Sequence, residues 1–216
     1  MALDLTFLQM TRGNANRNVK SATLVLASKS ETRHAILRAA AIPHEVAPAD
    51  LDERAIEGSA PTASAGDVAA LLAREKALVI AARRPGALVL GADQTLALGN
   101  RRFAKPADRA AAREQLLVLR NRTHELHSAI ALVQDQAILF EHRAIARLTM
   151  RAFSEEFLDR YLDLAGEGAT ASVGAYQLEK AGIQLFEHIE GDHFVILGLP
   201  LFPLLHFLRG QGYLLS

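Results

Sequence analysis

The feature that most constrains the fold is a short apolar run that leads directly into a helical pattern. Residues 24–27 (LVLA) are too few for a helix and suit a buried β-strand. Ser28 and Ser30 follow, and both are favourable N-cap residues, so we expect a helix to begin between them. Apolar side chains then follow with helical spacing at Ile36, Leu37, Ala40 and Ala41. A strand that turns directly into a helix predicts an α/β fold.

The same turn gathers groups that attract anions. The first turn of a helix leaves backbone N–H groups unpaired and carries the positive end of the helix dipole. Lys29, Arg33 and the hydroxyls of Ser28 and Ser30 belong to this turn. Most strand-to-helix turns that contain serine bind nothing, so the turn by itself leaves a purely structural role open. Together with the residues downstream, it indicates a cradle for the phosphates of a nucleotide.

The composition excludes several classes of protein. The 24 basic and 24 acidic residues give a net charge of zero, so no overall field favours a nucleic acid polymer or a membrane surface. The absence of cysteine excludes disulfides, thiolate nucleophiles and cysteine-bound zinc. Residues 1–20 show no signal-peptide pattern. We therefore expect a soluble, cytoplasmic protein.

We expect one domain over residues 23–216, preceded by a mobile N-terminal extension at residues 1–22. The most apolar run, residues 194–208, is interrupted by Pro200, Pro203 and His206. It is also shorter than the roughly 20 residues that a membrane span requires. Periodicity and capping residues predict helices at 66–83, 108–120, after Ser154 and at 200–209, and strands at 45–47, 87–92, 95–98, 125–133, 137–150, 174–177 and 183–189.

Carboxylates in three segments of the chain are candidates for a functional site. Residues 48–61 are interpreted as an acidic loop containing Glu53, which is either solvated or able to hold Mg²⁺ near a nucleotide. In the helix at 66–83, Glu75 lies on the expected apolar stripe and Lys76 at its edge. A buried carboxylate must be paired with a cation or bound to metal, and a structural arginine could supply the charge. Asp93 ends the apolar strand at 87–92, where ligands of open α/β sheets gather.

Six short motifs, in order, resemble those of the Maf family of nucleoside triphosphate pyrophosphatases. The resemblance extends from residue 24 to about residue 210. The motifs are the turn at 27–33 (ASKSETR), Asp52-Glu53, Glu75-Lys76-Ala77, Gly91-Ala92-Asp93, Lys105-Pro106 and Gly198-Leu199-Pro200. Each motif alone is weak, but six in register identify the family.

The resemblance implies an α/β fold with an ITPase-like mixed sheet, flanking helices and a cleft between two lobes, often assembled as a homodimer. It implies hydrolysis of a nucleoside triphosphate to the monophosphate and pyrophosphate, with Mg²⁺ or Mn²⁺. The roles it suggests are catalytic for Asp93, Lys76 and Lys105, substrate-binding for Ser28, Ser30, Arg33, Gln94 and Glu179, and metal-binding for Glu53 and Glu75.

Departures from the family pattern bear on the substrate. The branch that acts on dTTP and UTP usually has Arg, Thr and Gln at the positions of Thr32, Gln94 and Glu179. A second branch, acting on 7-methyl-GTP, matches Gln94 and Glu179 but commonly has Trp at position 32. A carboxylate accepts hydrogen bonds from both N–H groups of a guanine edge, whereas an amide suits uracil or thymine. We therefore expect a 7-methyl-GTP-type substrate, with dTTP or UTP as the alternative. Residues 127–129 (HSA) also depart from the usual Tyr-Thr-Gly.

Other functional classes find less support. His124 and His127 are not expected to share a metal, because residues three apart on a strand point to opposite faces. The chain has no G-x-S-x-G elbow and its first turn has no glycine, which disfavours acyl-transfer hydrolases and Rossmann dehydrogenases. The strongest rival is a nucleotide-binding regulator of septum formation without turnover. A pure sensor, however, needs neither a base such as Asp93 nor metal-binding acids.

Overall fold

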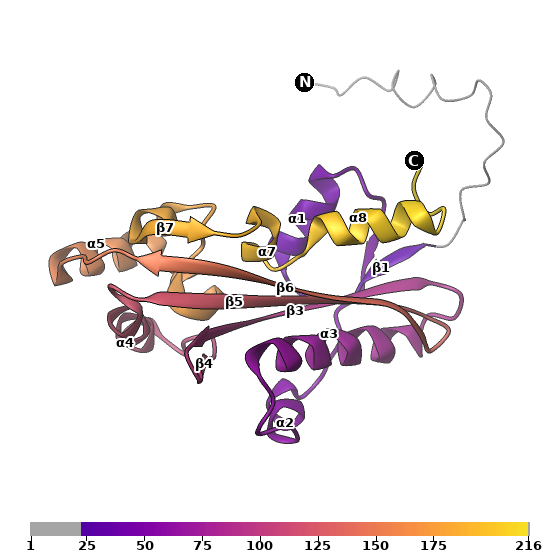
Figure 1. The fold of residues 1–216 in the computed structure, drawn as a ribbon, viewed down its shortest axis with the longest axis horizontal. Helices are drawn as coiled ribbons and strands as arrows, with labels where there is room; N and C mark the ends of the chain where they lie inside the picture. The colour runs from indigo at the N-terminus through magenta and orange to yellow at the C-terminus, as the bar shows by residue number, and fades with distance from the viewer. Residues whose placement is uncertain (1–22, 216) are drawn as a thin grey trace, which may run out of the picture.

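The computed structural model describes residues 23–215, so the expected extension at residues 1–22 lies outside the described part of the chain (Figure 1). A seven-stranded mixed sheet forms the centre, in the order β2-β1-β3-β5-β6-β7, with β4 paired to β3. β1 runs parallel to β2 and β3, and the other pairs are antiparallel. The strands are β1 (Leu24–Leu26), β2 (Glu45–Val46), β3 (Leu88–Leu98), β4 (Arg101–Phe103), β5 (Thr123–Gln134), β6 (Ala137–Met150) and β7 (Phe186–Glu190). The expected mixed α/β sheet is confirmed.

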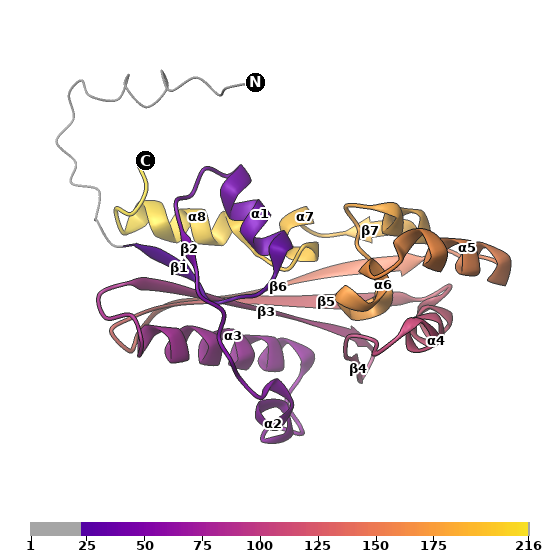
Figure 2. The ribbon, with the colours of Figure 1, turned by 180° about the vertical axis from the view of Figure 1, so that it is seen from behind.

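Helices cover both faces of this sheet. They are α1 (Glu31–Ala39), α2 (Glu53–Gly58), α3 (Ala65–Ala81), α4 (Arg109–Leu119), α5 (Glu155–Ala165), α6 (Gly168–Ala171), α7 (His193–Ile196) and α8 (Leu201–Gly210), with 3-10 turns η2 (Val173–Ala175) and η3 (Ala181–Leu185). Figures 1 and 2 show α1, α7 and α8 on one side of the sheet and α3 on the other. No helix within residues 23–215 is long and apolar enough to cross a membrane.

The first strand-to-helix unit follows from its sequence. Leu24 and Leu26 pack toward α1 and α8, whereas Val25, between them, packs toward α3. This alternation buries β1 on both faces, as its continuous apolar sequence predicts. Ser30 is the N-cap of α1, and its Oγ accepts a hydrogen bond from the backbone N–H of Arg33 at 3.3 Å. The predicted helix start is therefore confirmed.

Helix α3 lies unusually close to β3, and small residues make this possible. A Cβ placed on Gly91 would lie 1.9 Å from the carbonyl oxygen of Ala73, so the helix backbone rests directly on the strand. Ala69, Ala73 and Ala77 on the helix are fully buried at this contact. Lys76 is on the same buried face. The close approach requires glycine on the strand and alanine on the helix.

The expected apolar stripe of α3 (Val68, Leu71, Leu72, Val79 and Ala82, with Glu75 among them) is right only in part. Val68 and Leu72 are buried as expected. Leu71 and Val79 are only half-buried and Ala82 is exposed, because alanines face the sheet at these turns of the helix instead. Lys76, and not Glu75, points toward the sheet.

Three other expectations are corrected. The loop at 48–61 contains helix α2, whose N-cap Asp52 accepts a hydrogen bond from the N–H of Ala55 at 3.0 Å. β3 continues through Asp93 without a break, because β5 pairs with it on both sides of that residue. Residues 173–175 form a 3-10 turn instead of a strand, with Gly174 at a positive φ of 80° that a strand does not allow.

The two histidines at 124 and 127 occupy separate environments, as expected for neighbours three apart on a strand. His124 is fully buried beside the rings of Tyr176 and Phe186, with Nε2 2.7 Å from the hydroxyl of Tyr176. Burial lowers the pKa of His124 to about 4, so the ring is neutral at pH 7. His127 instead pairs with Glu125 at 2.9 Å. No shared metal site is formed by these two residues.

We predict that Gly91→Ala destabilises the protein by on the order of 3 kcal/mol, because the new methyl group must displace α3 from β3. Urea unfolding followed by circular dichroism measures the change in the free energy of unfolding. Gly58→Ala is the matched control, since a Cβ at Gly58 meets nothing within 4 Å. Equal stability of the two variants would show that the close helix–strand contact is absent in solution.

Candidate active site

The site forms where the outer edge of β3 has no strand partner. β1 pairs with β3 as far as Leu90, and β4 begins to pair only at Leu96. Among the described strands, none covers the interval between these two residues on that side. The backbone N–H of Ala27 still donates to the Leu90 carbonyl at 2.8 Å. Beyond it, the guanidinium of Arg33 donates to the Ala92 carbonyl at 3.0 Å, in the place that β1 would otherwise occupy.

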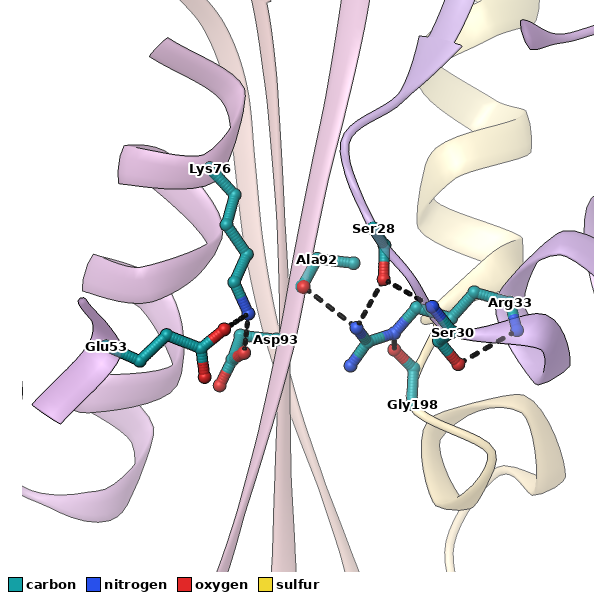
Figure 3. Close-up of polar contacts among 8 residues, drawn as sticks. All are labelled: Ser28, Ser30, Arg33, Glu53, Lys76, Ala92, Asp93 and Gly198. Carbon is teal, nitrogen blue, oxygen red and sulfur yellow. Dashed lines mark hydrogen bonds and ion pairs between the residues drawn. The ribbon is translucent and has the colours of Figure 1, made fainter. Parts of the chain in front are cut away.

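Arg33 is held rigidly on the α1 side of β3. Its Nε donates to the carbonyl of Gly198 at 2.8 Å, and its Nη1 donates to Ser28 Oγ at 3.0 Å (Figure 3). Gly198 has a positive φ of 88°, and a Cβ there would lie 3.2 Å from Arg33 Nη2, so glycine leaves room for the guanidinium. Within residues 23–215, Nη2 makes no hydrogen bond and remains able to bind an anion.

A second cluster lies on the α3 side of β3. The ammonium of Lys76 is 2.5 Å from Asp93 Oδ1 and 2.8 Å from Glu53 Oε1 (Figure 3). Asp93 and Lys76 are buried, whereas the Glu53 side chain is half exposed at the start of α2. Asp52 caps α2 and thereby fixes the position of Glu53. One lysine thus joins two carboxylates that come from different elements.

Electrostatics couple the two clusters across β3. Burial raises the pKa of the Asp93 carboxyl, and the positive charges of Lys76 and Arg33 offset this rise only in part. Burial likewise lowers the pKa of the Arg33 guanidinium, against the opposing effect of Asp93 and Glu53. A guanidinium remains charged despite such a shift. A carboxylate with a raised pKa is a better proton acceptor near neutral pH than an ordinary aspartate.

The donor set fits a divalent cation that is shared with phosphate. Asp93 Oδ2 and Glu53 Oε2 are not engaged by Lys76 and can serve as ligands. Among residues 23–215, no three acidic or histidine side chains gather closely enough to form a complete cage. Mg²⁺ commonly takes one or two carboxylates and completes its shell with water and substrate phosphates. Two free carboxylate oxygens suit that mode of binding.

The two residues expected to contact the base have partners within the protein. Gln94 Nε2 donates to Ser128 Oγ and to the carbonyl of Val195, both at 2.9 Å, which anchors α7 to β3 and β5. The Glu179 side chain is exposed and accepts a hydrogen bond from the Thr32 hydroxyl at 3.5 Å. This contact links α1 to the segment before η3.

Glu75 and Lys105 have no polar contact with either cluster. Within the described residues, neither side chain makes a hydrogen bond or an ion pair. Glu75 is half-buried on α3, and Lys105 is exposed between β4 and α4. Their suggested roles in metal and phosphate binding stay predictions.

Sequence reasoning missed the backbone acceptors of the site. The carbonyls of Ala92 and Gly198 orient Arg33, and no side-chain pattern reveals a carbonyl. The Gly-Ala-Asp and Gly-Leu-Pro motifs contain these residues, so the motifs were the available signal. The Thr32–Glu179 contact spans 147 positions and carries no local signature.

Comparison with known proteins identifies the family. The model of the Maf-like protein family matches residues 23–211. The chain belongs to the Maf family. A relative named nucleoside triphosphate pyrophosphatase, from Rhodopseudomonas palustris (strain ATCC BAA-98 / CGA009), is 56% identical over 191 residues, covering 88% of this chain and 95% of its own. A relative named 7-methyl-GTP pyrophosphatase, from Mesorhizobium japonicum, is 54% identical over 193 residues, covering 88% and 96%.

Among solved structures, this Maf-family chain is similar to a HAM1 protein from Coxiella burnetii. The TM-score is 0.43 at 19% sequence identity, covering 60% of this chain and 73% of that one.

We predict that Arg33→Lys lowers the free energy of unfolding by about 2–3 kcal/mol, because an ammonium cannot satisfy the Ala92 and Gly198 carbonyls together. Chemical denaturation measures the loss. Arg38→Lys, on the exposed side of the same helix, should stay within about 0.5 kcal/mol of the wild type. Indistinguishable variants would contradict a structural anchor at Arg33.

Proposed function

We propose that this Maf-family protein hydrolyses the bond between the α- and β-phosphates of a nucleoside triphosphate, releasing the monophosphate and pyrophosphate. The observation that carries the proposal is the pairing of Lys76 with Asp93 and Glu53, opposite the buried Arg33, at the open edge of β3. The printed names of the two relatives, both pyrophosphatases, support the same reaction class.

Asp93 acts as the proton acceptor for the attacking water. The water oxygen forms a bond to the α-phosphorus, the bond from that phosphorus to the bridging oxygen breaks, and pyrophosphate leaves with the electron pair. The proton of the water passes to Asp93, whose raised pKa suits this step. Base assistance of this kind contributes roughly 10²–10⁴ in rate.

Positive side chains stabilise the charge that develops on the phosphates. The free Nη2 of Arg33 binds phosphate oxygens, and Ser28 and Ser30 hold the turn that supports it. Lys76 neutralises Asp93 and Glu53 in the free protein and offers its ammonium to a phosphate oxygen when substrate enters. We retain Lys105, an exposed side chain between β4 and α4, as a further candidate for binding the phosphates.

A divalent cation, Mg²⁺ or Mn²⁺, is part of the proposal. Glu53 would hold it through its free carboxylate oxygen. We retain Glu75 as a further candidate ligand on α3. When bound, the cation offsets negative charge on the triphosphate and the leaving pyrophosphate.

Asp93→Asn separates catalysis from binding. We predict that kcat falls by about 10²–10⁴, because an amide accepts no proton at neutral pH, while the Kd for the nucleotide changes by less than about tenfold. Pyrophosphate release and isothermal titration calorimetry measure the two quantities. Asp163→Asn, on exposed α5, is the control and should retain full activity. A kcat unchanged in Asp93→Asn would remove Asp93 from this role, and binding without turnover by the wild type would favour a nucleotide-binding regulator.

We further propose that the nucleotide is 7-methyl-GTP. The Mesorhizobium japonicum relative with that name supports this choice. Glu179 supplies acceptor oxygens for the N1–H and the amine of a guanine, and its negative charge favours a base made cationic by N7-methylation. Thr32 contacts Glu179 Oε1 and leaves Oε2 for the base.

Glu179→Gln should change the preference among bases. We predict a fall of at least about tenfold in the ratio of kcat/KM for 7-methyl-GTP to that for UTP, because the carboxylate's second acceptor and charge are lost. A panel of 7-methyl-GTP, GTP, UTP and dTTP measures the ratio. Glu187→Gln on β7 is the exposed control. An unchanged ratio would exclude Glu179 from base recognition while leaving the reaction class intact.

A further inference from the structure

Thr95 lies in the same open interval of β3 as Asp93. β1 pairs with β3 as far as Leu90 and β4 begins to pair at Leu96, so no described strand covers Thr95 on that side. Successive residues of a strand point to alternate faces, so Thr95 shares with Asp93 the face that α3 covers. Figure 3 shows Asp93 on this face, beside Lys76. Thr95 is therefore the next side chain along this face from the proposed proton acceptor.

The hydroxyl of Thr95 has no partner in the described part of the chain. Within residues 23–215, its Oγ1 makes no hydrogen bond, although Thr95 is only 8% exposed. Among the same residues, the side-chain polar atoms that lack both a partner and solvent contact are Gln115 Oε1 and His124 Nδ1. Solvent therefore still reaches Thr95 Oγ1. A hydroxyl in such a place is destabilising unless it forms a hydrogen bond with water or with a ligand.

The residues around Thr95 leave Asp93 as its polar neighbour on β3. His127 lies directly opposite Thr95 on β5, but its ring binds the carboxylate of Glu125 at 2.9 Å. Ala97, the next residue of β3 on this face, has no polar side-chain atom. A water bound to the Thr95 hydroxyl therefore has the Asp93 carboxylate as the neighbouring polar side chain along the strand.

The spacing of Thr95 and Asp93 suits one bridging water. Residues two apart on a strand are separated by about 6.6 Å along the strand axis. A water with two hydrogen bonds of about 2.8 Å joins atoms that lie roughly 4.5–5.5 Å apart. Side chains of strands lean along the strand direction, which accounts for the difference. Lys76 binds Asp93 Oδ1 and leaves Oδ2 for the water.

We propose that Thr95 and Asp93 together hold the attacking water, an inference that rests on the hydrolysis proposed above. One O–H of the water donates to Asp93 Oδ2 and the other donates to Thr95 Oγ1. A lone pair of the water oxygen then remains for the α-phosphorus. The proton lost on attack passes to Asp93, and the Thr95 hydroxyl keeps its own proton throughout. Holding both O–H groups orients the nucleophile, which lowers the entropic part of the barrier.

Thr95→Val tests the hydroxyl apart from the shape of the side chain. Valine is also β-branched and suits a strand, so the midpoint of urea unfolding should be unchanged. With the fastest substrate among 7-methyl-GTP, GTP, UTP and dTTP, we expect kcat to fall about tenfold and KM to change less than about threefold. Thr95→Ser keeps the hydroxyl and should stay within about threefold of the wild-type kcat. Thr123→Val is the matched control on β5, where the Thr123 hydroxyl bonds to Thr149 at 2.9 Å, and it should keep full activity.

A double variant tests whether Thr95 acts on the same water as Asp93. In the Asp93→Asn background, Thr95→Val should lower kcat by less than about twofold, because residues that act on one group are not additive. A wild-type kcat in Thr95→Val, a loss that serine does not restore, or a tenfold loss in both backgrounds would overturn the role of Thr95 and leave the reaction intact. Absence of turnover in the wild type would overturn the reaction and this role together.

A crystal structure of the wild type without nucleotide tests the same contact independently of turnover. We expect an ordered water within about 2.6–3.2 Å of both Thr95 Oγ1 and Asp93 Oδ2. The corresponding structure of Thr95→Val should lack this water. A Thr95 hydroxyl bonded to a protein group, or a water that contacts Thr95 but not Asp93, would contradict the proposal.

Discussion

The site depends on one buried ammonium group placed between two carboxylates. Lys76 lies within ion-pair distance of both Asp93 and Glu53, and its side chain reaches them from a helix packed directly on the sheet. Burial and the charge of Glu53 raise the pKa of the Asp93 carboxyl, and the charge of Lys76 opposes this rise and favours the ionised form that can accept a proton. The close contact between α3 and Gly91 is thus part of the electrostatics of the site, because it sets how far Lys76 extends.

The sheet topology then determines which residue lies opposite Lys76 and its two carboxylates. β1 ends early, β4 starts late, and the intervening edge of β3 is left to the side chain of Arg33. One strand thereby presents an acidic cluster on one face and a basic cluster on the other, at nearly the same position along its length (Figure 3). We propose that the triphosphate contacts both clusters, with its reacting phosphorus between Asp93 and Arg33.

The elements with strong local signals could be predicted from the sequence. The β1–α1 unit, the hairpin of β5 and β6 and the capped helix α5 follow from apolar runs, turn residues and Ser154. The full buried face of α3 could not be predicted from the sequence. The alanines that permit close packing carry less apolar signal than Leu71 and Val79, which are only half-buried. The continuation of β3 through Asp93 was equally hidden, because it depends on pairing with a distant strand.

Short motifs in the sequence contain most of the candidate site residues, but the arrangement of these residues depends on long-range contacts. Arg33 meets Gly198 across 165 positions, and Lys76 meets Asp93 across 17. The most direct test of the account is a crystal structure of the wild type with Mg²⁺ and a 7-methyl-GTP analogue whose α–β bridge is a methylene group. We expect the α-phosphorus to lie between the Asp93 carboxylate and Arg33 Nη2, with Lys76 bound to a phosphate oxygen. A triphosphate bound away from these three side chains would contradict it.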